Sequence, residues 1–471
     1  METIDLIKST KVELLAKCAE LNILKCSSKT KHQLIELIRG SSVSINVLKP
    51  SITNSFIEHK ITENIVIKKE SESLMNIVPS NNRFKFIDLF CGIGGFHQAL
   101  HRLNGQCVFA SDIDENCRKV YEKNYGIKPE GDITKLDFTK IPEFDILCGG
   151  FPCQSFSNSG HKKGLDDKRG KLFEYILQIV SLHRPRFMFL ENVKHIQNID
   201  DGKTFQHIIK RINETGYHVD TFELSPHQFG IPQQRERVVF VCIRMDIYDE
   251  TKLLNIVPPE TPIQFETILE KDTSKTEKYK ISKETEDILT IWDQMIQKFK
   301  VGENLSPTIL CNEFNKTYSE IEFAALPAWK QDYITKNKPL YIKYKTIWDD
   351  WLQTNSVILN KKEVHAKLEW QTGKKTENDS IFNHFIQFRQ SGIRVKKAQY
   401  FPTLVAIVQT PIYAKEKRYI TPRECARLQS FPDSFIMHEN DHTAYKQFGN
   451  AVNVDVVHFV ISNTLLLYNL I

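Results

Sequence analysis

The stretch from about residue 83 to 245 alternates short apolar runs with helical segments, and this alternation restricts the fold more than any other feature. The apolar runs are rich in Val, Ile and Phe: RFKFIDLF, VFASD, DILCGG, RFMFLENV and RVVFVCI. The helical segments between them include KLFEYILQIVSLH and TFQHIIKRINETG. Strands that alternate with helices form βαβ units. We therefore predict an α/β fold with a doubly wound, mostly parallel sheet, in which ligands bind at the carboxyl ends of the strands.

The alternation stops at about residue 245 and gives way to a segment richer in Trp, Lys, Gln and Asn. It returns only in the tail, where AYKQFGNAVNVDVVHFVISNTLLLY predicts a loop and a final helix. The simplest organisation is one α/β body with a large insertion near its end. We divide it into residues 83–245, an inserted smaller domain at 246–418, and a return to the body at 419–471.

A glycine turn follows the first predicted strand, in FIDLFCGIGG, and a helix opens directly after it. Glycine lets the backbone approach a ligand closely. The next strand ends at Asp112, seventeen positions after Gly95, where an acid would bond ribose hydroxyls. A further acid, Asp132, follows in the next loop. The turn reads FxGxGG rather than GxGxxG and no phosphate-binding GK[ST] is present, so we predict S-adenosyl-L-methionine rather than a nicotinamide dinucleotide.

The segment GGFPCQSFS places Cys153 just after a predicted strand end. The preceding proline fixes φ and stiffens the turn, so the thiol is presented in one direction. A thiolate is a strong nucleophile. The usual fate of a free cysteine is that of a small buried apolar residue, and we expect this of Cys148, Cys242 and Cys425.

Composition narrows the class of protein further. The ten cysteines include no CxxC pair, so neither a structural zinc site nor a disulfide framework is expected. We find no secretory signal and no membrane-spanning apolar run, and we expect a cytoplasmic protein without a membrane partner. The formal net charge of +5 permits a polyanionic partner without requiring one.

Several motifs resemble, in order, those of the DNA cytosine-5 methyltransferases. They are FIDLFCGIGGF, SDID, GDIT, DILCGGFPCQSFS, RGKLF, FLENVK, FGIPQQRERV, TPRECARLQSFPD and YKQFGNAVNV. The resemblance covers roughly residues 83–245 and 418–460, and the chain is especially similar to the bacterial type II modification enzymes of restriction systems. It implies the methyltransferase fold, with residues 246–418 as the target-recognition domain.

The resemblance also implies roles for individual residues. The catalytic set would be Cys153, which adds to carbon 6 of cytosine, Glu191, which protonates or hydrogen-bonds ring nitrogen 3, and Arg235 and Arg237, which hold the base and the glutamate. The set that binds S-adenosyl-L-methionine would be Phe90, Gly92, Ile93, Gly95, Asp112, Ile113, Asp132, Ile133, Gly150, Pro152, Leu172, Asn450 and Val452. No metal is implied.

The expected function is transfer of a methyl group to carbon 5 of a cytosine in a specific double-stranded DNA sequence. A base pair hides carbons 5 and 6 within the stack, so the target base should be flipped out. The DNA contacts implied by position are Gln154, Ser159, Lys162 and Arg169, and, in the recognition domain, Arg389, Gln390, Arg394 and Lys396. Such enzymes act as monomers and protect DNA from a cognate restriction endonuclease, which is a further expected partner.

Alternatives remain at this stage. Residues 1–40 resemble a SAP-type nucleic-acid-binding module, but a helical hairpin without such a role fits the pattern equally; residues 41–82 read as a linker. The substrate could be tRNA rather than DNA, although tRNA enzymes of this kind resemble compact proteins with a much smaller recognition region. A catalytically silent DNA-binding relic is a third reading, which the intact motifs argue against.

Overall fold

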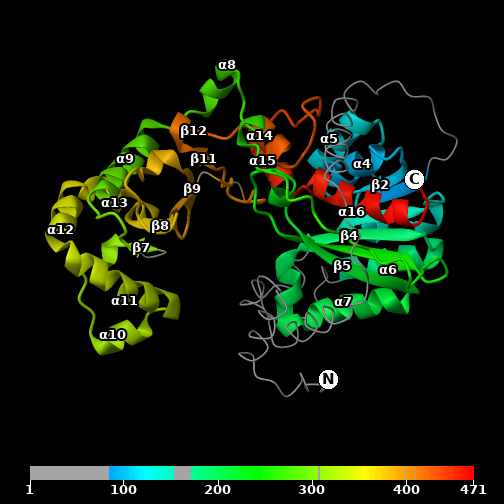
Figure 1. Ribbon diagram of the computed structural model, residues 1–471, viewed down its shortest axis with the longest axis horizontal. Coiled ribbons are helices and arrows are strands. Elements are labelled where there is room, and N and C mark those ends of the chain that lie inside the picture. The colour runs from blue at the N-terminus through cyan, green and yellow to red at the C-terminus, as the bar shows by residue number, and fades with distance from the viewer. Residues whose placement is uncertain (1–83, 153–170, 306–307, 398, 408) are drawn as a thin grey trace, which may run out of the picture. The chain divides into compact units, whose positions relative to one another are not determined.

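The computed structural model in Figure 1 describes residues 84–152, 171–305, 308–397, 399–407 and 409–471. The predicted helical module at 1–40 and the linker at 41–82 lie outside the described residues. The same holds for five predicted site residues: Cys153, Gln154, Ser159, Lys162 and Arg169.

Six strands form a sheet of order β2-β1-β3-β4-β6-β5. The strands are β1 (Lys85–Leu89), β2 (Gln106–Ser111), β3 (Ile146–Gly150), β4 (Phe187–Val193), β5 (Tyr217–Leu224) and β6 (Arg237–Arg244). Strands β2, β1, β3 and β4 run parallel, whereas β6 is antiparallel to its neighbours β4 and β5. This arrangement confirms the predicted mostly parallel, doubly wound sheet.

Helices cover both faces of this sheet. They are α4 (Gly95–His101), α5 (Glu115–Tyr125), α6 (Lys171–His183), α7 (Lys203–Glu214) and α16 (Val454–Leu467). Successive strand residues point to opposite faces. On β4, Phe187 and Phe189 belong to the core formed with α4, α5 and α16, while Met188 and Leu190 belong to the core formed with α6 and α7. A strand buried on both faces must be apolar throughout, which explains the continuous runs in the sequence.

The tail of the chain differs from the prediction. We expected a loop before the final helix, but Asp441–Asn450 forms α15. Asn440 caps this helix by accepting a hydrogen bond from the Thr443 amide at 3.0 Å. The apolar residues Ala444 and Phe448 are four positions apart and both buried, so packing stabilises the helix despite its glycine and asparagine end.

Among the described residues, one helical stretch, Asp441–Leu467, is long and apolar enough to cross a membrane by length and composition. Its residues Val456, Val460 and Ile461 are buried in the core shared with α4 and α5. Core packing therefore accounts for the apolar character of this stretch.

A second six-stranded sheet has the order β12-β11-β9-β10-β8-β7. Its strands are β7 (Ile309–Leu310), β8 (Lys367–Gln371), β9 (Phe385–Arg389), β10 (Gly392–Lys396), β11 (Ile412–Tyr413) and β12 (Arg418–Tyr419). The helices of this region are α8 (Thr273–Thr276), α9 (Lys283–Gln297), α10 (Glu320–Ala325), α11 (Ala328–Lys343), α12 (Lys345–Thr354) and α13 (Ser356–Lys361). Leu368 and Ile393 of the sheet pack with Trp292 and Trp348 of the helices in a core of their own.

Glu424 joins three segments at the point where the second sheet leads back to the first. It lies in α14 (Pro422–Leu428) and is fully buried, as is Arg418 of β12. The Arg418 guanidinium donates to both Glu424 oxygens, at 2.8 and 2.9 Å. The same carboxylate accepts from the Thr421 amide at 2.6 Å and from the Glu270 amide at 2.8 Å. All four hydrogen bonds depend on one side chain.

We expect Glu424→Ala to lower the free energy of unfolding by about 3–5 kcal/mol, because it leaves Arg418 buried without its bidentate partner. Glu416→Ala is the matched control. Glu416 also accepts from Arg418, at 2.7 Å, but its side chain is 47% exposed, so about 1 kcal/mol or less should be lost. Urea denaturation of both variants measures the difference. Equal losses would contradict the role given to Glu424.

Candidate active site

The turn after β1 has an unusual backbone. Phe90, Gly92 and Gly94 all have positive φ, at 53°, 52° and 87°. Such a conformation is rare for a bulky residue like Phe90 and is held only where the surroundings require it. The Gly92 amide donates to the Asp112 carboxylate at 2.8 Å, which ties this turn to the end of β2. A Cβ on Gly95 would lie 2.7 Å from the Val452 carbonyl oxygen, so only glycine fits there.

Asp112 is oriented from both sides. One carboxylate oxygen accepts from Gly92 and the other accepts from the Asp114 amide at 2.8 Å. Burial raises the pKa of Asp112 above its usual value. Each oxygen can accept a second hydrogen bond. The neighbouring Ile113 is 76% exposed, so an apolar side chain lies at the surface next to a carboxylate that is held in place.

Asp132 lies in the loop that follows. The Asp112 amide donates to the Glu130 carbonyl at 3.0 Å, which brings this loop alongside the end of β2. Asp132 caps the short turn Ile133–Lys135 by accepting from Thr134, and these hydrogen bonds lower the pKa of Asp132. Ile133 is buried. The acids and the glycine turn thus share the carboxyl ends of β1 and β2.

Glu191 lies at the carboxyl end of β4, directly opposite Gly150 of β3. A Cβ on Gly150 would lie 3.4 Å from the Glu191 carboxylate and 3.7 Å from the Val452 side chain. Asn192, the next residue, donates to the Phe151 carbonyl at 3.0 Å. This bond holds the segment that runs through Pro152 toward residue 153 against the end of β4.

Arg237 and Arg235 have different surroundings. Arg237, on β6, donates through Nε to Glu191 at 2.8 Å, and both side chains are largely enclosed. Arg235 is buried, and its guanidinium donates to three carbonyls: Leu404 at 2.6 Å, Gly449 at 2.9 Å and Ala451 at 3.2 Å. Of the two arginines, only Arg237 holds Glu191.

Arg235 also identifies contacts that sequence reasoning missed. Its partners Gly449 and Ala451 flank Asn450, which is exposed at the end of α15. Its partner Leu404 follows Thr403, whose hydroxyl donates to the Gln234 carbonyl at 2.6 Å. Nothing in the sequence indicates these pairings, since the partners are main-chain atoms about 170 and 215 positions away.

Two predicted cofactor residues remain. Leu172 lies on α6 and packs, partly buried, against the core on that face, and Ile93 is buried in the core on the other face. The structure therefore places Gly92, Asp112, Gly150, Glu191 and Val452 along one edge of the sheet. The buried cysteines expected at 148, 242 and 425 are confirmed as buried thiols.

The four predicted DNA contacts that the structure describes lie on the second sheet. Arg389 ends β9, Gln390 is in the turn, and Arg394 and Lys396 are on β10. Arg394 donates through Nε to Glu369 of β8 at 2.7 Å, and Arg389 approaches the same oxygen at 4.0 Å. Partial burial lowers the pKa of Lys396.

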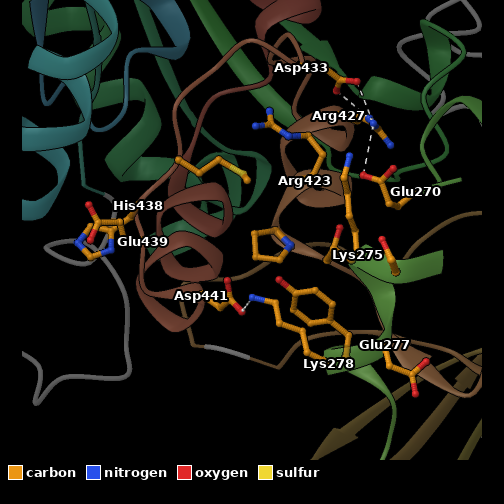
Figure 2. Close-up of a pocket in the computed structure, with 15 residues that line it drawn as sticks. Glu270, Lys275, Glu277, Lys278, Arg423, Arg427, Asp433, His438, Glu439 and Asp441 are labelled. Carbon is orange, nitrogen blue, oxygen red and sulfur yellow. Dashed lines mark hydrogen bonds and ion pairs between the residues drawn. The ribbon is translucent and has the colours of Figure 1, made fainter. Parts of the chain in front are cut away.

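A hollow of about 940 Å³ lies between residues 270–279 and helices α14 and α15 (Figure 2). Some of its charges are paired across the gap, for instance Arg427 with Glu270 at 3.7 Å and Lys278 with Asp441 at 2.9 Å. None of the predicted site residues that the structure describes lines it. We interpret it as a contact region in which ion pairs hold residues 270–279 against α14 and α15.

Comparisons with known proteins agree with this geometry. The family model described as C-5 cytosine-specific DNA methylase matches residues 84–465. The type II methyltransferase M.HhaI of Haemophilus parahaemolyticus is 32% identical over 379 residues, which are 80% of this chain and 93% of that enzyme. M.HpaII of Haemophilus parainfluenzae is 33% identical over 396 residues, covering 82% and 90%.

Among solved structures, the Entamoeba histolytica methyltransferase EhMeth covers 81% of this chain and 98% of its own, with a TM-score of 0.47 and 18% identity. The family match extends over most of the chain and includes both sheets. The chain therefore belongs to the family of C-5 cytosine-specific DNA methylases, which confirms the predicted class of enzyme, a DNA cytosine-5 methyltransferase.

Proposed function

We propose that this enzyme transfers a methyl group from S-adenosyl-L-methionine to carbon 5 of a flipped-out cytosine in a specific double-stranded DNA sequence, through a covalent bond from Cys153 to carbon 6. The observation that carries the proposal is the pairing of Glu191 with Arg237 at the strand end beside Gly150. The segment leading to Cys153 starts at this strand end and is held there by Asn192.

The chemistry assigns one task to each side chain. Carbon 5 of cytosine is a weak nucleophile, and addition of the Cys153 thiolate at carbon 6 makes it enamine-like. After methyl transfer, loss of the proton on carbon 5 expels the thiolate from carbon 6 and restores the aromatic ring. Glu191 supplies or shares a proton at ring nitrogen 3, where negative charge would otherwise collect. Arg237 fixes the position of Glu191 through the 2.8 Å bond. Arg235 acts from a distance, because it orders the main chain at Gly449 and Ala451 rather than touching the base.

The residues at the strand ends fit a nucleoside without phosphates. Gly92 leaves room for close approach, Asp112 keeps acceptor capacity for ribose hydroxyls, and exposed Ile113 would pack on the purine ring. Asp132 would face the base edge, and Phe90, Gly150, Asn450 and Val452 would surround the methionine part. When bound, the cofactor supplies an electrophilic methyl group on its sulfonium.

We further propose a biological setting. The relatives are named type II methyltransferases, so this chain would modify DNA that a cognate restriction endonuclease otherwise cleaves. We propose that it acts as a monomer in the cytoplasm. A tRNA substrate is less well supported, since the matching family is one of DNA methylases and the chain carries a second sheet with its own core.

Mapping of 5-methylcytosine tests the proposal directly. Purified enzyme, S-adenosyl-L-methionine and unmethylated plasmid should give modification at one short recurring sequence, read by bisulfite sequencing. Cys153→Ala should abolish this modification, because the thiolate that activates carbon 5 is lost, while DNA and cofactor still bind. Cys425→Ala is the control, since that thiol is buried in the core, and it should retain activity. Residual methylation by Cys153→Ala would refute the covalent mechanism.

Asp112→Ala should weaken cofactor binding, because a charged acceptor of hydroxyl donors is lost. Hydrogen bonds to charged groups contribute about 1.5–3 kcal/mol, so the dissociation constant should rise about 10- to 150-fold. Calorimetry with S-adenosyl-L-methionine measures it. Asp137→Ala is the control, because this acid likewise accepts hydrogen bonds in a short turn but lies outside the proposed site. An unchanged dissociation constant for Asp112→Ala would show that this carboxylate does not contact the cofactor.

Deletion of residues 1–80 should leave the methylated sequence unchanged, because we place recognition in the second sheet. The affinity for DNA can fall while the methylated DNA sequence stays the same if the N-terminal module contacts only the sugar-phosphate backbone. Bisulfite maps of the full and shortened chains provide the comparison. A different target sequence after deletion would contradict this division.

A further inference from the structure

The second sheet has one apolar face, and its opposite face is polar over β8 and β10. Leu368, Ile393 and Ile386 point to the core with the helices. Their strand neighbours point the other way, since side chains alternate along a strand. Glu369 and Arg394 are direct partners in the parallel pair of β8 and β10, and Gln371 is the partner of Lys396. The polar face therefore carries a row of charged and amide side chains.

A hollow of about 520 Å³ opens on this polar face. Its floor is formed by Glu369, Gln371 and Arg394, and Gln390 lies at its edge. Its wall is formed by Trp329 and Tyr333 of α11, whose rings meet at a centroid distance of 6.2 Å. Trp329 is 54% exposed, which is unusual for so large an apolar side chain. An aromatic wall, two amides and a guanidinium form a lining suited to a nucleobase.

Arg394 is held in one orientation. Its Nε donates to Glu369 at 2.7 Å, and Glu369 is only 4% exposed. No acceptor among the described residues is bonded to the two terminal nitrogens of Arg394. The planar guanidinium therefore keeps one edge on the carboxylate and presents the other edge to the hollow. Two parallel N–H donors match the O6 and N7 acceptors of guanine in the major groove.

We propose that this hollow reads a guanine in the recognised DNA sequence. Arg394 specifies the guanine, and Glu369 positions Arg394. Trp329 and Tyr333 form a wall against the neighbouring nucleotide. The inference rests on the proposed function and deepens it by naming a base. A phosphate would fit less well, because Glu369 lines the hollow and pairs with Arg394, and the other cation of the lining, Lys367, is paired with Glu363.

The first experiment compares bisulfite maps of plasmid DNA treated with the wild type, Arg394→Ala, Glu369→Gln and Lys336→Ala. Both hollow variants should accept other bases at one guanine position of the target sequence, with discrimination reduced about 5- to 150-fold. Lys336 is an exposed residue of α11 paired with Asp332, so its removal should change nothing. An unchanged target sequence for Arg394→Ala, with methylation only slower overall, would indicate a phosphate contact and overturn the inference.

The second experiment uses the wild type alone, so that it does not depend on how a variant folds. Each guanine of a synthetic target duplex is replaced in turn by 7-deazaguanine, which removes the N7 acceptor and keeps base pairing. One replacement should lower kcat/KM about 5- to 150-fold for the wild type and leave Arg394→Ala unaffected at that position. No sensitive guanine, or an equal drop in both enzymes, would overturn the inference. A wild type that methylates no DNA would refute the proposed function itself.

Trp329 offers an independent check. Trp329→Ala should weaken binding of the target duplex about 5-fold or more, in the range of an aromatic contact with a base. Ile342→Ala removes another exposed apolar residue of the same helix and should leave binding unchanged. Equal effects of the two substitutions would show that the wall is not part of the hollow's function.

Discussion

The close contact between the tail of the chain and two glycines of the first sheet is the constraint on which the site depends. Val452 lies against Gly95 at the start of α4 and against Gly150 at the end of β3, and a Cβ on Gly95 would collide with it. The contact joins residues more than 300 positions apart and closes the strand-end edge on one side. Neither the glycine turn nor the Glu191 carboxylate would be enclosed without it.

The same tail connects the site to the second sheet. Arg235 holds Gly449 and Ala451 through Nη2 and Leu404 through Nη1, so one buried guanidinium bonds the segment around Val452 and the segment that follows β10. Gly449 permits this approach, because a side chain there would strike the Val405 carbonyl. The position of the second sheet is thereby linked to the order of the residues around Val452.

The sequence predicts much of the first sheet, because strands buried on both faces give long apolar runs that helices interrupt. The glycine turn and Asp112 were also predictable, since their spacing reflects the geometry of one βα unit. The helix α15 was missed because glycine and asparagine favour a loop locally, and only packing of Ala444 and Phe448 reverses that preference. The distinction between Arg235 and Arg237 could not be predicted, as burial rather than residue type separates them. Glu369 gave no signal either, because its role depends on Arg394 of the neighbouring strand, 25 positions away in the sequence.

The position of Val452 near the end of the chain has a consequence for synthesis on the ribosome. A chain emerges from its N-terminus, and domains begin to fold as they appear. The strands and glycine turn of the first sheet are complete by residue 244, yet the element that encloses their carboxyl ends is made only at residues 449–452. A chain truncated before residue 449 therefore lacks the contact that encloses these strand ends, and it also lacks α16, which covers one face of the sheet. The strand ends are enclosed only once almost the whole chain has been made.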